Sequence, residues 1–231
     1  MNDQLILLLE TATSSCSVAL SENGKIIAVK EADERNIHAS HITLFIEELM
    51  INTGRKYSDL KAVAVSKGPG SYTGLRIGVS TAKGLCYALD IPLLGIDTLE
   101  AMASGLLSKT DIQDPDLLIP MIDARRMEVY TGIFQKDLKV IEPVSAKIVD
   151  VSSFNQFEGR NLVLFGDGAS KFKELFADQN NIRFIDFTNS AKDLNFLACR
   201  KFSNGEAENV AYFEPFYLKD FLLTKSTKSN D

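Results

Sequence analysis

Residues 68–78 read Gly-Pro-Gly-Ser-Tyr-Thr-Gly-Leu-Arg-Ile-Gly and come shortly after the apolar run at 62–65. Glycines allow close approach of the backbone, and the first amides of a helix favour an anion. The stretch therefore predicts a buried strand, a glycine-rich loop and a helix that runs to about residue 89.

The glycine-rich loop is a candidate phosphate site. Its candidate residues are Gly68, Gly70, Ser71 and Thr73, together with Thr11 from an earlier turn of small hydroxyl residues. The loop is not a Walker A motif, because no Gly-Lys-Ser/Thr ends it, and it lacks the spacing of a dinucleotide fingerprint. Because Gly and Pro are also the commonest turn residues, an ordinary turn stays open as an alternative.

The helix predicted after the loop carries small residues at every fourth position. Such a strip lets the backbone of another helix lie very close, either from a partner protein or from within the chain. Apolar side chains follow the same side of the helix. As a partner interface, this face would consist of Gly74, Leu75, Gly78, Val79, Ala82 and Cys86.

A second helix is predicted for residues 40–53, because a serine can cap its start and a glycine ends it. Leu44 and Ile51 lie off its main apolar face. A helix that is apolar on more than one side is either deeply buried or touches a partner. The candidate interface residues on its main apolar face are Ile42, Phe45 and Leu49.

Three short apolar runs open the chain at 4–10, 16–21 and 25–30, and helices alternate with strands after them. That order predicts an α/β protein. The opening strand, tight turn and strand are echoed at 117–134. The echo indicates two duplicated lobes, as in an actin-like or sugar-kinase-like (ASKHA) fold, with a second lobe that is reduced because its later elements are shorter.

An acidic, irregular stretch at 111–116 marks the expected crossing between the lobes. The predicted domains are an N-terminal lobe at 1–110, a reduced C-terminal lobe at 111–224 and a flexible tail at 225–231. Within the second lobe we expect strands at 162–165 and 183–187, and helices at 170–177 and 192–202.

The composition narrows the functional classes. The chain has 231 residues and a net charge of -6. Because of this negative charge, it is not expected to bind nucleic acid on its own. Its three cysteines form no Cys-x-x-Cys pair, which is typical of buried thiols in a reducing compartment. No apolar run approaches the roughly 20 residues of a membrane span, and the start lacks the basic region of a signal peptide. We expect a cytoplasmic protein.

The chain has few histidines that could serve in catalysis. The two histidines, His38 and His41, could face one metal ion, but no third ligand stands near them, so we expect no metal site. We expect them at a helix start or in an interface, where they could titrate near neutral pH. A Ser-His-Asp triad would need one of them, and no Gly-x-Ser-x-Gly elbow occurs.

Four stretches in the same order resemble the TsaB family, also called YeaZ. They are Glu-Thr-Ala-Thr with Cys-Ser-Val-Ala-Leu at 10–20, the loop at 68–78, Leu-Glu-Ala at 99–101, and Asp-Ala-Arg-Arg-Met-Glu-Val-Tyr at 123–130. The resemblance implies a fold similar to acetate and sugar kinases, Hsp70 and actin. It also implies a dimerisation partner of TsaD, which transfers a threonylcarbamoyl group to an adenosine beside the anticodon of tRNA. TsaE, an ATPase, would be a further partner.

Two departures follow from that resemblance. TsaD-like enzymes hold a metal through two histidines, and Thr98 and Met102 stand at the matching positions here. A hydroxyl and a thioether suit a borderline divalent metal poorly. Glu10 replaces the aspartate that relatives carry at the first turn, and its extra methylene would displace the carboxylate. The resemblance therefore implies a subunit without catalysis and without a required cofactor, with weak nucleotide binding left open.

Three hypotheses follow from the sequence. The first is a non-catalytic subunit that binds TsaD through both predicted helices and meets tRNA only within that complex. The second is a small phosphotransferase or ATPase that uses Thr11, Ser71 and Thr73 around a phosphate. The third is a homodimer formed through the same helices, which would also be expected of an isolated interaction subunit.

Overall fold

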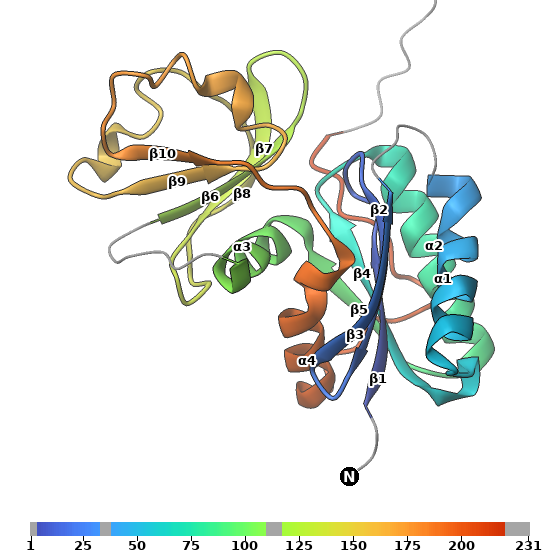
Figure 1. The fold of residues 1–231 in the computed structure, drawn as a ribbon. Helices are drawn as coiled ribbons and strands as arrows, with labels where there is room; N and C mark the ends of the chain where they lie inside the picture. The colour runs from blue at the N-terminus through green and yellow to red at the C-terminus, as the bar shows by residue number, and fades with distance from the viewer. Residues whose placement is uncertain (1–3, 33–37, 110–116, 220–231) are drawn as a thin grey trace, which may run out of the picture.

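The computed structural model describes residues 4–32, 38–109 and 117–219, which form two lobes, each built on a five-stranded sheet (Figure 1). The strands of the first sheet are β1 (Leu5–Glu10), β2 (Cys16–Glu22), β3 (Lys25–Ala32), β4 (Leu60–Gly68) and β5 (Leu93–Asp97). Those of the second are β6 (Leu117–Asp123), β7 (Glu128–Phe134), β8 (Val140–Ile148), β9 (Leu162–Phe165) and β10 (Ile182–Ile185).

The two sheets have the same topology. The first has the order β3-β2-β1-β4-β5 and the second the order β8-β7-β6-β9-β10. In each sheet, the first three strands along the chain form an antiparallel meander. The fourth strand pairs parallel with the first, and the fifth pairs parallel with the fourth. The predicted duplication is therefore confirmed, although the sequence pattern had missed β8.

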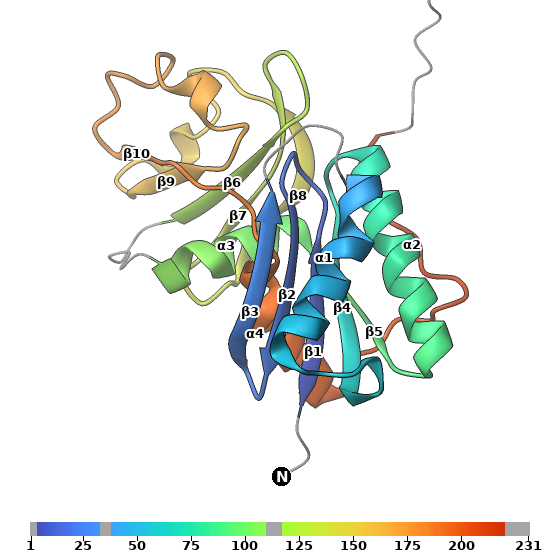
Figure 2. The same ribbon diagram turned by 45° about the vertical axis from the view of Figure 1, so that its right-hand side comes forward.

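Helices cover both faces of the first sheet. On one face lie α1 (His38–Thr53) and α2 (Tyr72–Leu89), and on the other lies α4 (Asn195–Asn204) after the short 3-10 helix η4 (Ala191–Leu194) (Figures 1 and 2). Because β1 is central and covered on both sides, all six of its residues are buried. Its continuous apolar sequence is the pattern expected of such a strand.

The helix α3 (Thr98–Lys109) lies between the two sheets (Figure 1). Its Met102 and Leu106 pack with Leu118 and Phe165 of the second sheet. Ala101 instead joins the core of the first lobe. This helix is apolar on several sides because each side meets a different lobe, and it therefore fixes how the lobes sit against each other.

The second lobe is reduced, as predicted. Short 3-10 helices, η2 (Asn155–Phe157) and η3 (Ser170–Phe172), stand where the first lobe has long helices; the remaining short helix, η1 (Tyr57–Asp59), precedes β4. The helix predicted at 170–177 is wrong: beyond η3 the chain continues as turns. Phe172 and Phe176 are both buried, so their helical spacing reflects packing against the sheet.

The predicted boundary of the second lobe is also wrong. After β10 the chain returns to the first lobe, where Ala191, Leu194 and Leu197 pack against Ile6 and Leu8. Residues 205–219 then cross the first lobe as an extended strap; one backbone bridge joins Glu208 to β5. The second lobe thus ends before η4, well short of residue 224. The tail predicted at 225–231 lies outside the described residues.

Within the described ranges, every helix is too short or too polar to cross a lipid bilayer.

Two neighbouring residues of α4 test its assignment to the first lobe. Leu197 is fully buried, whereas Phe196 is 59% exposed. Leu197→Ala should lower the free energy of unfolding by about 2–5 kcal/mol, because it leaves a cavity against β1, while Phe196→Ala should cost less than about 1 kcal/mol. Denaturant titration of both variants measures this. Equal losses would contradict the packing.

Candidate functional site

The glycine-rich loop packs directly onto the β1–β2 turn. The backbone N–H of Ser71 donates to the carbonyl of Ala12 at 2.6 Å, and the Thr11 hydroxyl donates to the carbonyl of Gly74 at 2.8 Å. Ser71 is also the N-cap of α2, and its side chain accepts a hydrogen bond from the Gly74 amide. Groups that could have held a phosphate are thus already engaged with the neighbouring turn.

The glycines of the loop are required by this contact. A Cβ at Gly70 would clash with Ala12, and a Cβ at Gly74 or Gly78 would clash with Thr11. Each position therefore excludes any side chain, so that the start of α2 can lie against the backbone of the turn.

The five candidate phosphate residues do not surround a common space. Thr11 is fully buried and Gly68 is buried under the carbonyl of Phe216 from the C-terminal strap. Gly70 is half-buried, and only Ser71 and Thr73 are exposed. The structure thus corrects the expectation of a phosphate cradle, because the close packing of loop on turn leaves Thr11 no access to a ligand.

Glu10, at the end of β1, is buried at the same place. Its carboxylate accepts hydrogen bonds from the Ala12 amide at 2.6 Å and from the Ser66 hydroxyl at 2.9 Å. Burial raises the pKa of this carboxyl to about 7, and the negative charge of Asp193 contributes in the same direction. Glu10 therefore braces the turn from inside the lobe.

Thr98 and Met102 are both buried in α3. The Thr98 hydroxyl finds no hydrogen-bond partner among the described residues, and the Met102 methyl group lies against Gly166. Asp97 caps this helix by accepting from the amides of Leu99 and Glu100, and burial raises its pKa to about 6. In the described part of the chain, no three His, Cys, Asp or Glu side chains gather as metal ligands would.

The histidines are placed only in part. The ring of His41 meets Phe45 edge-on, with 5.7 Å between the ring centroids. The side chain of His38 lies outside the described residues.

The nine residues predicted to contact a partner are instead core residues of this chain. Their side chains, or their backbone in the case of the glycines, pack toward the first sheet and its β1–β2 turn. The interface expectation is corrected for these positions, since a helix that covers a sheet turns its most apolar face inward. The buried nine are Ile42, Phe45, Leu49, Gly74, Leu75, Gly78, Val79, Ala82 and Cys86.

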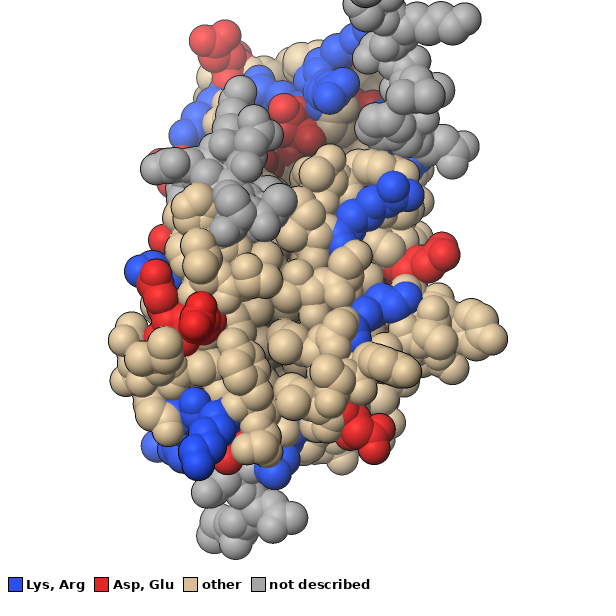
Figure 3. All heavy atoms as spheres, turned by 90° about the vertical axis from the view of Figure 1, so that its right-hand side faces the viewer, with Lys and Arg blue, Asp and Glu red and all other residues tan. Residues whose placement is uncertain are grey.

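The outward side of α1 and α2 carries a different set of apolar groups, of which the sequence pattern had placed Leu44 and Ile51 off the main face. Leu44 is 51% exposed, Ile51 69% and Tyr87 84%. Between the two helices lies a groove of about 280 Å³. Figure 3, which looks onto this side of the molecule, shows a central area of uncharged side chains with charged ones around it. The groove is lined by Thr43, Ile46, Tyr57, Ser80, Thr81, Gly84 and Leu85.

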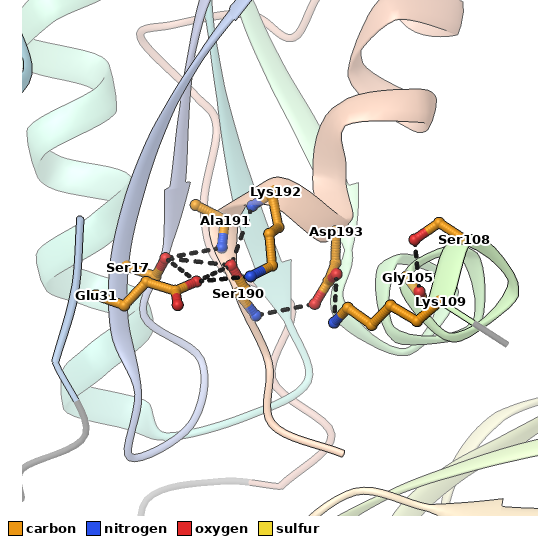
Figure 4. A network of polar contacts seen from close by, with 9 residues as sticks. All are labelled: Ser17, Glu31, Gly105, Ser108, Lys109, Ser190, Ala191, Lys192 and Asp193. Carbon is orange, nitrogen blue, oxygen red and sulfur yellow. Dashed lines mark hydrogen bonds and ion pairs between the residues drawn. The ribbon is translucent and has the colours of Figure 1, made fainter. Parts of the chain in front are cut away.

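A polar network joins the end of α3 to the segment by which the chain returns to the first lobe (Figure 4). The first crossing, expected at 111–116, lies outside the described residues. Lys109, at the end of α3, pairs with the buried Asp193 at 2.9 Å, and Asp193 also accepts from the Ser190 amide. The Ser190 hydroxyl donates to Glu31 of β3. Lys109, the last residue of α3, is thus joined to the first residues after the chain returns to the first lobe.

The raised pKa of Glu10 predicts a pH effect on stability. Because the folded carboxyl titrates near 7 and the unfolded one near 4.5, the folded state holds this proton more tightly between those values. This contribution to stability is therefore complete below about pH 4.5 and is lost as pH rises through about 7.

Glu10→Gln should remove this loss, since an amide oxygen can still accept from Ala12. Relative to the wild type, the variant should gain up to about 3 kcal/mol of unfolding free energy between pH 5 and pH 8. Denaturant titrations of the wild type and the variant at pH 5 and at pH 8 measure this difference. The other buried carboxyls are present in both proteins, so their contributions cancel. A gap that stays constant with pH would contradict the assignment.

Comparisons with known proteins agree over most of the chain. The family model for TsaD, described as tRNA N6-adenosine threonylcarbamoyltransferase, matches residues 31–222. The chain is 31% identical to the tRNA threonylcarbamoyladenosine biosynthesis protein TsaB of Escherichia coli (strain K12), over 95% of this chain and 96% of that protein. It is 35% identical to TsaB of Haemophilus influenzae, over 97% of this chain and 98% of that protein.

Solved structures show the fold. YeaZ from Pseudomonas aeruginosa superposes with a TM-score of 0.77 at 23% identity, over 93% of this chain and 100% of that one. A polyphosphate/ATP-glucomannokinase from Arthrobacter gives a TM-score of 0.53 at 8% identity, over 87% of this chain and 99% of the kinase chain. The expected sugar-kinase-like fold is thus confirmed. With the sequence matches, these findings establish that the chain belongs to the TsaB (YeaZ) family of tRNA threonylcarbamoyladenosine biosynthesis proteins.

Proposed function

We propose that the chain is a non-catalytic subunit that binds TsaD and supports the formation of threonylcarbamoyladenosine in tRNA, next to the anticodon. The observation that carries this proposal is the exposed apolar groove between α1 and α2. A soluble protein rarely leaves such a face open unless a partner covers it. The names of its relatives point to threonylcarbamoyladenosine biosynthesis as the process.

The interface uses the outward side of the two helices. Leu44, Ile51 and Tyr87 supply exposed apolar area on that side. The buried face beneath them holds both helices in place, so the surface is preformed and binding costs little ordering.

The absence of catalysis is supported by the side chains at two positions of α3. Thr98 and Met102 offer a hydroxyl and a thioether where two imidazoles would be needed. The loop amide of Ser71 is already bound to Ala12. The competing phosphotransferase or ATPase is therefore not favoured, and calorimetry with ATP and magnesium should give no tight binding and no turnover by the isolated chain.

The same surface accounts for the expected homodimer of an isolated subunit. An isolated subunit would pair with a second copy through α1 and α2, because an exposed apolar surface is buried when it packs against the same surface of another copy. TsaE would join the assembled complex, and tRNA would reach this subunit only there. All of this takes place in the cytoplasm.

Gly84 gives a sharp test of the interface. It lies in the groove with no atom within 4 Å of where a Cβ would be, so a large side chain fits the free chain and fills the groove. Gly84→Trp should weaken the complex with TsaD more than about tenfold, which corresponds to about 1.4 kcal/mol. It should leave thermal stability unchanged or raised, because glycine disfavours a helix interior.

The control is Ser203→Trp on α4, at an exposed position on the opposite side of the first sheet. Size-exclusion chromatography and calorimetry at micromolar concentrations measure complex formation. Restoration of threonylcarbamoyladenosine in cells depleted of the native subunit measures function. Equal behaviour of the two variants would overturn the interface, and failure of the unchanged chain to bind TsaD would overturn the proposed function.

A further inference from the structure

The turn between β6 and β7 carries two arginines in an unusual backbone conformation. Arg125 and Arg126 have φ angles of 72° and 53°, in the left-handed region that side chains other than glycine rarely adopt. They are the one Arg-Arg pair in the sequence. Both are exposed, and within the described residues neither guanidinium makes a hydrogen bond or an ion pair.

Backbone hydrogen bonds hold this turn in place. The Arg125 amide donates to the Asp123 carboxylate at 3.0 Å, and its carbonyl accepts from the Glu128 amide at 3.2 Å. The Ala124 amide donates to the Glu128 carbonyl at 3.1 Å. The Asp123 amide donates to Asp167 at 3.1 Å, which ties the turn to the one that follows β9. The two arginines are therefore presented by a fixed backbone, and among the described residues no polar group holds their side chains.

The acidic groups of the turn are occupied by other cations. Lys171 pairs with Asp123 at 2.5 Å, and Lys219 of the C-terminal strap pairs with Glu128. Lys171 also donates to the Glu128 carbonyl at 2.7 Å. Because these carboxylates are paired with lysines, the charges of Arg125 and Arg126 stay free for a ligand, on a chain whose net charge is -6.

The strap connects this turn to the proposed partner face. Lys219 reaches Glu128 at the turn, while Tyr217, two residues earlier, stacks on Tyr72 with 4.7 Å between the ring centroids. Tyr217 also accepts a hydrogen bond from Arg76 of α2 at 3.3 Å. The arginine pair therefore lies just beyond the first turn of α2, next to the face proposed to bind TsaD but not within its groove.

We propose that Arg125 and Arg126 bind the phosphodiester backbone of the tRNA that is held by the complex with TsaD. The inference rests on the proposed function. Guanidinium groups bind phosphate oxygens in a bidentate geometry, and such contacts position a nucleic acid without reading its sequence. An RNA is favoured over an acidic protein segment for two reasons. The protein partner is already assigned to the apolar groove, and the charges left unpaired on this fixed turn are cationic.

The test uses the Arg125→Gln/Arg126→Gln double variant, which removes both charges and keeps the side-chain length. Its matched control is Lys25→Gln/Lys61→Gln, which removes two exposed charges at the opposite end of the first sheet. Each chain is first combined with TsaD and checked by size-exclusion chromatography. Fluorescence anisotropy with labelled tRNA, from 50 to about 300 mM salt, then gives the affinity and its salt dependence.

The arginine variant should form the complex normally and bind tRNA at least about tenfold more weakly. The slope of log affinity against log salt concentration should become shallower by about one for each lost phosphate contact. Arg125→Lys/Arg126→Lys, which keeps both charges, should retain most of that slope. The control should bind tRNA within about twofold of the unchanged complex.

An intact complex whose tRNA affinity and salt slope match those of the control would overturn the inference alone. A complex that the arginine variant fails to form before RNA is added, while the control forms it, would show that the pair binds protein, and this too would overturn the inference. Failure of the unchanged chain to bind TsaD would overturn the proposed function, and with it the inference.

Discussion

The contact on which most of this structure depends is the packing of the start of α2 against the β1–β2 turn. Gly70, Gly74 and Gly78 bring the loop and the helix to the backbone of Thr11 and Ala12. Three consequences follow. The groups of a phosphate site bind each other instead of a ligand, α2 is locked against the sheet, and α1 packs beside it so that a groove remains between their outward sides. One steric requirement thus both engages the groups of the candidate phosphate site and supports the proposed interaction surface.

The second lobe packs against the first through α3. Its crossover helices are reduced to 3-10 turns, and α3 fills the space between the sheets with apolar side chains. The Lys109–Asp193 pair joins the end of α3 to η4. The second lobe presents its β6–β7 turn, the counterpart of the β1–β2 turn in the first lobe, with two guanidinium groups that are unpaired within the described part of the chain.

Much of the fold could be predicted from local patterns. The apolar run of β1, the echo at 117–134 and the glycine-rich loop each report on contacts between neighbouring segments, so they identified both lobes and their order. The return of the chain at η4 could not be predicted in this way, since the apolar spacing of α4 indicates a buried face but not which sheet covers it. The prediction of a helix at 170–177 was wrong for a similar reason, because Phe172 and Phe176 are buried by the sheet and not by helical packing.

For the candidate site, too, some features could be predicted from the sequence and others depend on tertiary packing. By itself, the sequence determined that something must approach Gly74 and Gly78 very closely, that α1 is apolar on two sides, and that Thr98 and Met102 cannot serve as imidazoles do. Only the tertiary structure decided that the group against those glycines is Thr11 of the same chain, and that Leu44 and Ile51, rather than Ile42 and Phe45, face outward. The physical reason is that spacing along a helix defines its faces, whereas the neighbour that each face meets depends on how distant segments pack.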